Sequence, residues 1–212
     1  AEDWLSPGAD KRYAASRERA RFRHYDREQE VVNRWLQFCD PGATVLDFPC
    51  GTGRFSELVA SCGHRLIRAD LSYLMVAHAH QCGSKASVIG DVCCDLARPA
   101  IAPYSVDVVL IWRFFHHCQT SQDRALVLER AAYLARRYVI ISFYNRASVT
   151  YWYRRLSSSL FRRKPKGRGA IWTSELRRIA ADSGLKPVEI VHFQPVLSIN
   201  SAACFAVSSR LS

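Results

Sequence analysis

Residues 45–55 read Val-Leu-Asp-Phe-Pro-Cys-Gly-Thr-Gly-Arg-Phe, the most informative stretch of the sequence. The apolar run 44–48 predicts a short buried strand, and a helical pattern begins at Phe55. Gly51 and Gly53 stand between them, and glycine allows positive φ angles and close approach of a ligand to the backbone. The stretch therefore predicts a strand, a turn and a helix, with room for a ligand at the turn.

The alternation of strands and helices continues on both sides of this stretch. Apolar runs predict further strands over residues 64–69, 86–89, 106–112, 138–143, 188–193 and 202–208. Helical periodicity predicts helices over residues 11–38, 73–81, 122–136 and 173–183. Strands that alternate with helices form a parallel sheet, and the last two strands have no helix between them. We expect an open, mostly parallel, Rossmann-like α/β sheet of about seven strands, with helices on both faces and an antiparallel terminal hairpin.

Positive charge is concentrated in one segment of the 212-residue chain. The net charge is +11, and residues 146–170 supply eight Lys and Arg with no acid. Apolar side chains within this segment fall on one face of a predicted helix, and we expect that face to pack on the core: Val149, Trp152, Tyr153, Leu156 and Leu160. Three roles remain open for the segment: covering a substrate pocket, lying on an anionic membrane surface, or binding RNA phosphates.

The cysteines and the apolar runs indicate the cellular compartment and whether the chain spans a membrane or binds a metal. Eight scattered cysteines with no C-x-x-C pair favour free thiols in a reducing, cytoplasmic compartment. No apolar run in the sequence approaches the length that spans a bilayer. Of His78, His80 and Cys82, only His78 and Cys82 share a helical face, so we expect no metal site.

Three acids stand where successive predicted strands end. Asp47 can accept hydrogen bonds from loop amides or from a ligand amine, Asp70 from both hydroxyls of a ribose, and Asp91 from an adenine amino group. Acids that only cap helices beside a tight turn are the structural alternative.

The quoted stretch resembles the first motif of class I S-adenosylmethionine-dependent methyltransferases, in which an acid precedes a glycine-rich loop. Pro49 replaces the usual first glycine. The resemblance extends over residues 45–143, because Asp70 matches the ribose-binding acid, Asp91 the adenine-side acid, and residues 106–117 the fourth strand with its loop. It implies S-adenosylmethionine as the cofactor, bound by Asp47, Pro49, Cys50, Gly51, Gly53, Asp70, Leu71, Asp91 and Val92.

His116 and His117 follow the fourth strand, and either can act as a general base near the methyl acceptor. The alternative is that one packs beneath the cofactor while the other caps the next helix. We expect the acceptor to contact Tyr13, Arg113, Trp152, Arg154 and Arg155. Trp-Arg-Phe-Phe stands at 112–115 in place of the Asn/Asp-Pro-Pro-aromatic motif, which disfavours methylation of adenine or cytosine amino groups.

The resemblance implies one methyltransferase domain with four parts: an N-terminal helical cap (1–40), a cofactor-binding core (44–145), the basic amphipathic insert (146–170) and a terminal helix with the strand hairpin (171–212). We expect methyl transfer by direct displacement to a small or lipid-linked anionic acceptor, in the cytoplasm and peripheral to the inner membrane face. RNA methylation and a non-catalytic cofactor-binding or partner subunit are alternatives. A dinucleotide-binding dehydrogenase is a further alternative, with Gly51, Gly53 and Ser56 as its fingerprint.

Overall fold

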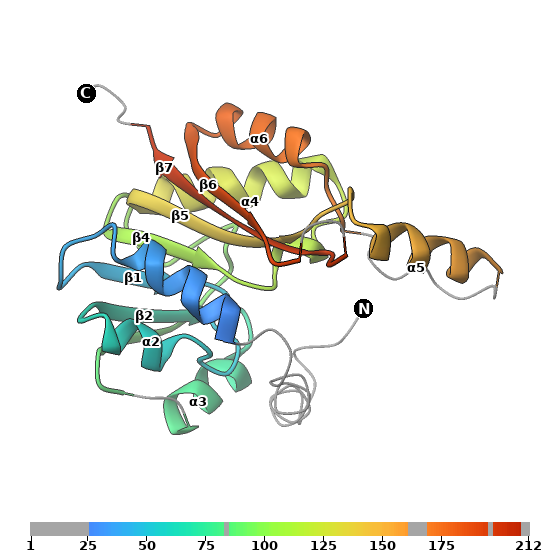
Figure 1. The fold of residues 1–212 in the computed structure, drawn as a ribbon. Helices are drawn as coiled ribbons and strands as arrows, with labels where there is room; N and C mark the ends of the chain where they lie inside the picture. Colours follow the sequence, from blue (N-terminus) through green and yellow to red (C-terminus); the bar gives the residue numbers. More distant parts are fainter. Residues whose placement is uncertain (1–25, 83–84, 161–168, 195–196, 209–212) are drawn as a thin grey trace. The chain divides into compact units, whose positions relative to one another are not determined.

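Seven strands form a single sheet in the order β3-β2-β1-β4-β5-β7-β6. The computed structural model describes residues 26–82, 85–160, 169–194 and 197–208 (Figure 1). The strands are β1 (Thr44–Asp47), β2 (Arg65–Asp70), β3 (Val88–Cys93), β4 (Val106–Ile111), β5 (Ala135–Tyr144), β6 (Leu185–His192) and β7 (Asn200–Val207). The helices are α2 (Ser56–Ser61), α3 (Tyr73–Cys82), the 3₁₀ helix η1 (Phe115–His117), α4 (Ser121–Leu134), α5 (Val149–Leu160) and α6 (Thr173–Asp182). Residues 26–36 are also helical.

The strand directions confirm the expected sheet. β1 is parallel to β2 and to β4, and β2 is parallel to β3. β7 is antiparallel to both β5 and β6, so β6 forms the edge of the sheet and β7 lies inside it. The described residues contain no helix that is both long enough and apolar enough to cross a membrane.

The chain divides into two compact units, and residues up to Leu110 together with 134–136 form the first. Two of its parallel strands are buried, as expected where helices cover both faces of a parallel sheet: all of β1 is buried, and Asp107 is the one residue of β4 that is not. Asp107 accepts a hydrogen bond from the Thr44 amide at 2.8 Å. The helical segment 26–36 buries the apolar face predicted for it: Val31, Val32, Trp35 and Leu36.

Residues 111–133 and 137–212 form the second unit. β7 is its central strand, with Cys204 opposite Ile140 of β5 and Ala203 opposite Ile190 of β6. Glu175 of α6 accepts hydrogen bonds from Ser121 and Arg124 of α4, which ties the two helices together.

The boundaries of several predicted elements were wrong. β3 runs to Cys93, whereas the sequence predicts a strand over 86–89 that stops before Gly90, so Asp91 lies inside β3 and does not end it. β5 begins at Ala135, directly after α4, because the strand continues the sheet where helical periodicity alone predicts two more helical residues. The predicted helix over 11–38 is described only from residue 26.

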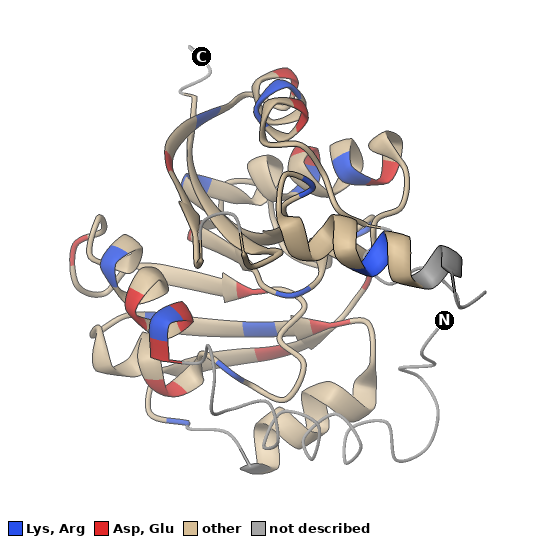
Figure 2. Ribbon diagram, turned by 45° about the vertical axis from the view of Figure 1, so that its right-hand side comes forward, with Lys and Arg blue, Asp and Glu red and all other residues tan. Residues whose placement is uncertain are grey.

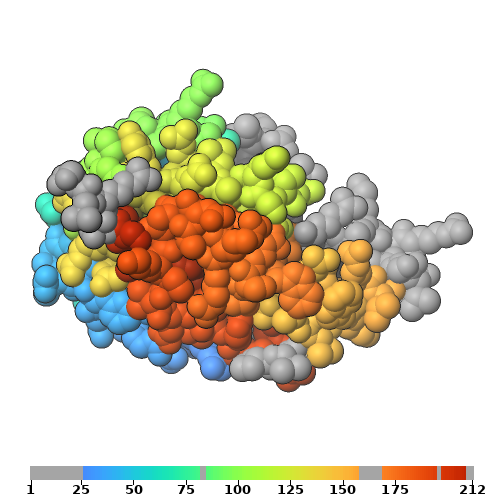
Figure 3. Space-filling view, turned by 90° about the horizontal axis from the view of Figure 1, so that it is seen from above, coloured from blue at the N-terminus to red at the C-terminus, as the bar shows by residue number. Residues whose placement is uncertain are grey.

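The insert between β5 and α6 starts and ends at one place in the second unit. The Arg146 amide donates to the Ile171 carbonyl at 3.0 Å, and the Ile171 amide donates to the Tyr144 carbonyl at 2.9 Å. A Cβ atom on Gly169 would lie only 1.7 Å from the carbonyl oxygen of His116, so residue 169 fits only as glycine. In Figure 2, α5 carries blue basic residues and no red acidic ones, and Figure 3 shows α5 (yellow-orange) beside α6 (orange) at the surface of their unit.

Gly169→Ala is expected to lower the free energy of unfolding by about 1–3 kcal/mol, because the added methyl group must displace the backbone of η1. Gly90→Ala is the matched control, since a Cβ atom there meets nothing within 4 Å. Urea unfolding of both variants checks this difference. Equal midpoints for Gly169→Ala and wild type would show that the insert does not rest on His116.

Candidate functional site

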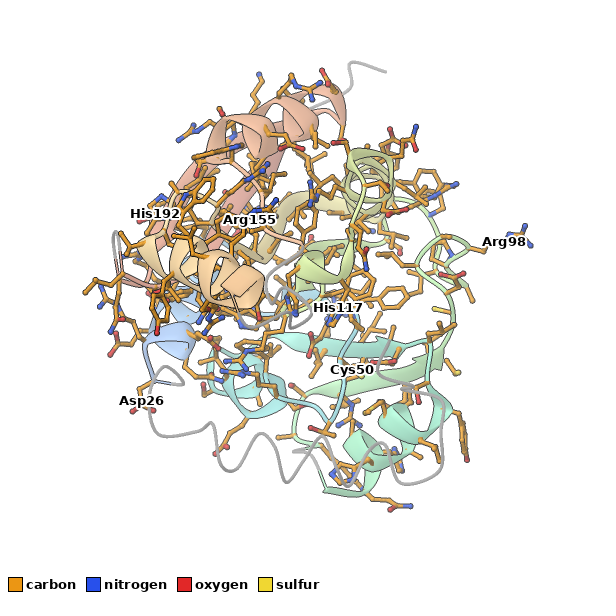
Figure 4. The ribbon with its side chains drawn as sticks, turned by 90° about the vertical axis from the view of Figure 1, so that its right-hand side faces the viewer. Asp26, Cys50, Arg98, His117, Arg155 and His192 are labelled. Carbon is orange, nitrogen blue, oxygen red and sulfur yellow. The ribbon has the colours of Figure 1, made fainter. Side chains whose placement is uncertain are left out.

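The loop after β1 is fixed to the ends of two neighbouring strands. The Phe48 amide donates to the Leu110 carbonyl at 2.9 Å, and the Cys50 amide donates to the Ala69 carbonyl at 2.8 Å. Pro49 is half-buried and Cys50 is buried within this loop; Figure 4 labels Cys50. Burial, followed by the nearby Asp47 and Asp70 carboxylates, raises the pKa of the Cys50 thiol well above its usual value. The thiol therefore stays protonated and unreactive at neutral pH.

Both predicted glycines adopt conformations that other residues avoid. Gly51 has a φ of 52° and Gly53 a φ of 76°, which lie in the left-handed region. A Cβ atom on Gly53 would also lie 3.1 Å from Ser56 Oγ and 3.3 Å from the Cβ of Ala79. These glycines keep the turn narrow and leave its backbone open to close approach.

The Asp70 carboxylate joins the glycine turn to the end of β2. Its Oδ2 accepts from the Gly51 amide at 3.0 Å, and its Oδ1 accepts from the Ser72 amide at 2.9 Å. Burial raises the pKa of Asp70, and the backbone hydrogen bonds from Ser72, Gly51 and Leu71 offset part of that rise. Each carboxylate oxygen has a second lone pair, so Asp70 retains capacity for a ligand hydroxyl. Leu71, beside it, is 56% exposed.

Asp91 lies in a different setting from the one that the sequence suggests. Arg68 Nε donates to Asp91 Oδ1 at 2.6 Å and Arg68 Nη2 to Oδ2 at 2.8 Å, while His80 Nδ1 is 2.8 Å from Oδ2. Burial alone would raise the pKa of Asp91, but the hydrogen bonds from Arg68 and His80 outweigh burial and lower it. Arg68 is fully buried, so Asp91 neutralises a cation inside the fold. The contact of Asp91 with an adenine stays a prediction. The cofactor contact expected for Val92, the next residue, also stays a prediction.

The register of β3 brings two residues to the site that sequence reasoning missed. Cys93 stands opposite Asp70 in the parallel ladder, and the Cys94 amide donates to the Asp70 carbonyl at 3.0 Å. Cys93 is exposed and its Sγ lies 3.5 Å from the carbonyl oxygen of Leu71. Two consecutive cysteines carry no sequence signal for a binding site, and only the extended length of β3 reveals their place.

Helix 26–36 also reaches the glycine turn. Arg54, directly after Gly53, donates to the carboxylate of Glu28, and both side chains are almost fully buried. The predicted cap therefore contacts the turn within the described part of the chain. Tyr13, which we expect to contact the acceptor, lies outside the described residues.

Arg113, which follows β4 and belongs to the second unit, has a strained backbone. Arg113 has a φ of 55°, unusual for a residue with a side chain, and its amide donates to Ser142 Oγ at 2.6 Å. Such backbone strain clusters at functional sites. The Arg113 side chain is half-buried.

His116 and His117 occupy unlike environments. The His116 ring stacks on Tyr144, with centroids 4.2 Å apart and planes 16° apart, whereas His117 is exposed and labelled in Figure 4. Burial, then the nearby His117 and Arg113, lowers the pKa of His116 to about 3. A ring with this pKa stays neutral at physiological pH and accepts protons poorly. Of the two candidate bases, the environment favours His117.

The described residues of the apolar face of α5, Val149, Trp152, Tyr153 and Leu156, are exposed and do not pack on the core, so the expectation was wrong for them; the Leu160 side chain is not described. Tyr151, on the opposite side of the helix, is buried with Ala170, Ile199 and Tyr144. The predicted acceptor residues Trp152, Arg154 and Arg155 are exposed. Figure 4 labels Arg155 on α5.

The metal expectation concerns α3, where His80 pairs with Asp91 and the Cys82 side chain is not described. Among the described residues, no group of three or more His, Cys, Asp or Glu could hold a metal ion.

The comparisons with known proteins cover the glycine turn and residues of both units. Residues 45–137 match the profile of a family described as a methyltransferase domain. A search of curated protein sequences finds no match.

Solved structures share the fold. The chain resembles magnesium protoporphyrin IX methyltransferase from Synechocystis PCC 6803 with bound SAH, at a TM-score of 0.73 and 21% identity over 87% of this chain and 84% of that one. It also resembles the methyltransferase in complex with the Haloferax volcanii Trm112 methyltransferase activator, with a TM-score of 0.70 and 16% identity over 98% and 100%. A third similar structure is a TehB-like SAM-dependent methyltransferase from Corynebacterium glutamicum ATCC 13032. Its TM-score is 0.66 and its sequence identity 17%, over 96% of this chain and 100% of that one.

The residues present fit S-adenosylmethionine as the cofactor. The glycine turn leaves its backbone open, and Asp70 has acceptor capacity for ribose hydroxyls. Ser56 Oγ is buried beside Gly53 without a hydrogen-bond partner among the described residues, so a polar group of a ligand can satisfy it. This site, the strand order and the family match over residues 45–137 support a class I S-adenosylmethionine-dependent methyltransferase.

Proposed function

We propose that this enzyme methylates an anionic acceptor, small or lipid-linked, by direct displacement. Bound S-adenosylmethionine would supply a methyl group on a positively charged sulfur, to which an acceptor lone pair would bond as the carbon–sulfur bond breaks and its electrons stay on sulfur. The chain's own work is to orient the acceptor and to exclude water. Asp70, at the glycine turn, binds the ribose of the cofactor.

The observation that carries the anionic acceptor is the setting of Arg146. Its guanidinium carbon lies 5.9 Å from the ring centroid of Tyr151 and 5.7 Å from that of Trp172. Its Nε is buried and has no hydrogen-bond partner among the described residues, and no described acid pairs with the guanidinium. Aromatic rings hold the guanidinium plane in place without neutralising its charge, and a planar guanidinium matches a carboxylate or phosphate. Arg146 is therefore preorganised for an oxyanion.

The charge around Arg146 supports the same acceptor class. Residues 146–170 contain eight basic side chains and no acid, so the local field attracts anions. Arg113 adds a cation at the end of β4 in the same unit, on a strained backbone. An acceptor whose anionic group rests on Arg146 is the simplest use of this arrangement.

RNA methylation is the second candidate, because the same charges can bind phosphates. The two candidates differ in the product. We would incubate the enzyme with S-adenosylmethionine labelled in its methyl group and, separately, with extracted lipids, small polar metabolites and RNA. Label in an anionic compound of the lipid or small-molecule fraction supports the proposal, and label only in RNA contradicts it. Cofactor binding without transfer to any fraction would indicate a partner subunit.

Asp70→Asn is expected to raise the dissociation constant for S-adenosylmethionine about 10- to 150-fold, because a charge-assisted hydrogen bond to the ribose is lost. The free energy of unfolding should fall by about 1–3 kcal/mol, because Asn has a single acceptor oxygen and leaves one of the Gly51 and Ser72 amides unpaired. Asp91→Asn is the contrasting variant. It leaves buried Arg68 without its charged partner and should cost about 2 kcal/mol or more of stability.

Calorimetric titration and thermal unfolding of both variants measure these two effects separately. Unchanged cofactor affinity in Asp70→Asn would place the ribose elsewhere.

His116 is expected to remain neutral down to about pH 4, as its lowered pKa requires. The unfolded chain takes up this proton near pH 6.5, so the stability that neutral His116 contributes is complete above about pH 6.5 and declines as the pH falls toward 3. His116→Asn should therefore lose less stability than wild type between about pH 7 and about pH 5. NMR titration of the imidazole signals and urea unfolding at both pH values provide the check. A His116 signal that titrates near its ordinary pKa would restore it as a candidate base.

Arg146→Gln is expected to weaken binding of inorganic phosphate, used as a probe, at least about tenfold, since a charge-assisted contact is removed. Arg178→Gln on α6 is the control, because Arg178 is exposed and pairs with Asp182 at 3.8 Å. The NMR signal of the Arg146 Nε–H group should shift as phosphate is added, whereas that of Arg68 should not. Equal phosphate affinity in wild type and Arg146→Gln would remove Arg146 from the acceptor site.

A further inference from the structure

Helix α5 exposes a continuous apolar stripe. The stripe consists of Val149, Trp152, Tyr153 and Leu156. Each of these residues has another member three or four positions away, which places all four on one side of the helix. Their exposed fractions are 53%, 43%, 70% and 64%. Single exposed apolar residues are common on proteins, but a contiguous group marks an interaction surface.

The packing of α5 itself turns this stripe outward. Tyr151 points from the opposite side of the helix into a small core with Ala170 and Ile199, and Tyr144 packs against it. In Figure 1, α5 extends away from β7 and α6 of its own unit. Because the buried side is fixed by Tyr151, rotating the stripe inward would expose that ring.

Charge decides which partner fits the stripe. Arg154 and Arg155 are exposed on α5, and the insert that contains them has eight basic residues and no acid. A second copy of this chain would bring the same positive charge to the contact and repel it. RNA would use the charges but leave Val149 and Leu156 in water. An anionic bilayer takes both, because its interface accepts Trp, Tyr and aliphatic side chains while its headgroups attract arginines.

We propose that α5 lies on the surface of an anionic lipid bilayer, with Trp152, Tyr153 and Leu156 in the interface and Arg155, one helical turn after Trp152, against the headgroups. This inference builds on the proposed function, since it selects the lipid-linked acceptor over the small soluble one. It concerns binding alone, so it can fail while methyl transfer to an anionic acceptor stands.

The test is flotation of the full chain with vesicles of phosphatidylglycerol and phosphatidylcholine, and with vesicles of phosphatidylcholine alone. Wild type should float with the anionic vesicles and not with the neutral ones. Arg155→Gln should weaken this binding about fivefold. Trp152→Gln combined with Leu156→Gln should weaken it more than about tenfold, because both apolar side chains lose their place in the interface. Raising the salt from about 0.1 M to about 1 M should release wild type.

The matched controls make the same chemical changes on other exposed positions of the second unit. Arg177→Gln with Arg178→Gln on α6, and Leu126→Gln on α4, should bind vesicles as wild type does. All α5 changes are at exposed positions, so circular dichroism and the affinity for S-adenosylmethionine should remain unchanged. Binding that is absent, equal on neutral vesicles, or equally reduced by the control variants overturns the proposal. Steeply salt-dependent binding of RNA without vesicle binding overturns it as well.

Discussion

The Asp70 carboxylate is the constraint on which the cofactor site depends. It accepts one backbone amide from the glycine turn and one from the residue that opens α3, so a single side chain fixes the end of β2 to both. Burying a carboxylate is costly unless its oxygens are hydrogen-bonded, and the two amides meet that requirement without a counter-ion. The site therefore presents a negative group that no nearby cation among the described residues neutralises. A ligand with hydroxyl groups gains from it, whereas an anionic ligand at the same spot would be repelled.

Much of the first unit, which holds the glycine turn, could be predicted from the sequence, because its elements follow from local patterns of residue type and spacing. The turn at Gly51 and Gly53, the apolar strands around it and the place of Asp70 all follow from residue types and spacing. The setting of Asp91 could not be predicted in this way. Its position depends on where β3 ends, which is set by pairing with β2, and on Arg68, a charged residue inside an apolar strand. Sequence patterns place an arginine at the surface by default, so a buried ion pair escapes them.

For the insert, the helix was predicted correctly, but the side of the helix that packs on the protein was not. Its amphipathic helix was predicted and is present, but the side that packs is the side of Tyr151. Periodicity identifies an apolar stripe without saying what covers it, and the usual assumption is the protein's own core. One large aromatic residue on the polar side was enough to reverse the orientation. The two histidines after β4 show the same limit, since spacing cannot tell the stacked, neutral His116 from its exposed neighbour.

The two hydrogen bonds between residues 144–146 and Ile171 have an evolutionary consequence. A segment that leaves and rejoins the fold at one point can change in length and composition without altering the strands on either side of it. Related enzymes are then free to exchange this segment while the sheet stays constant, and substrate choice can diverge faster than cofactor use. The same closed base makes residues 147–168 a natural cassette for grafting. A recipient scaffold must supply only the backbone partners at the two ends and a glycine where the chain returns past η1.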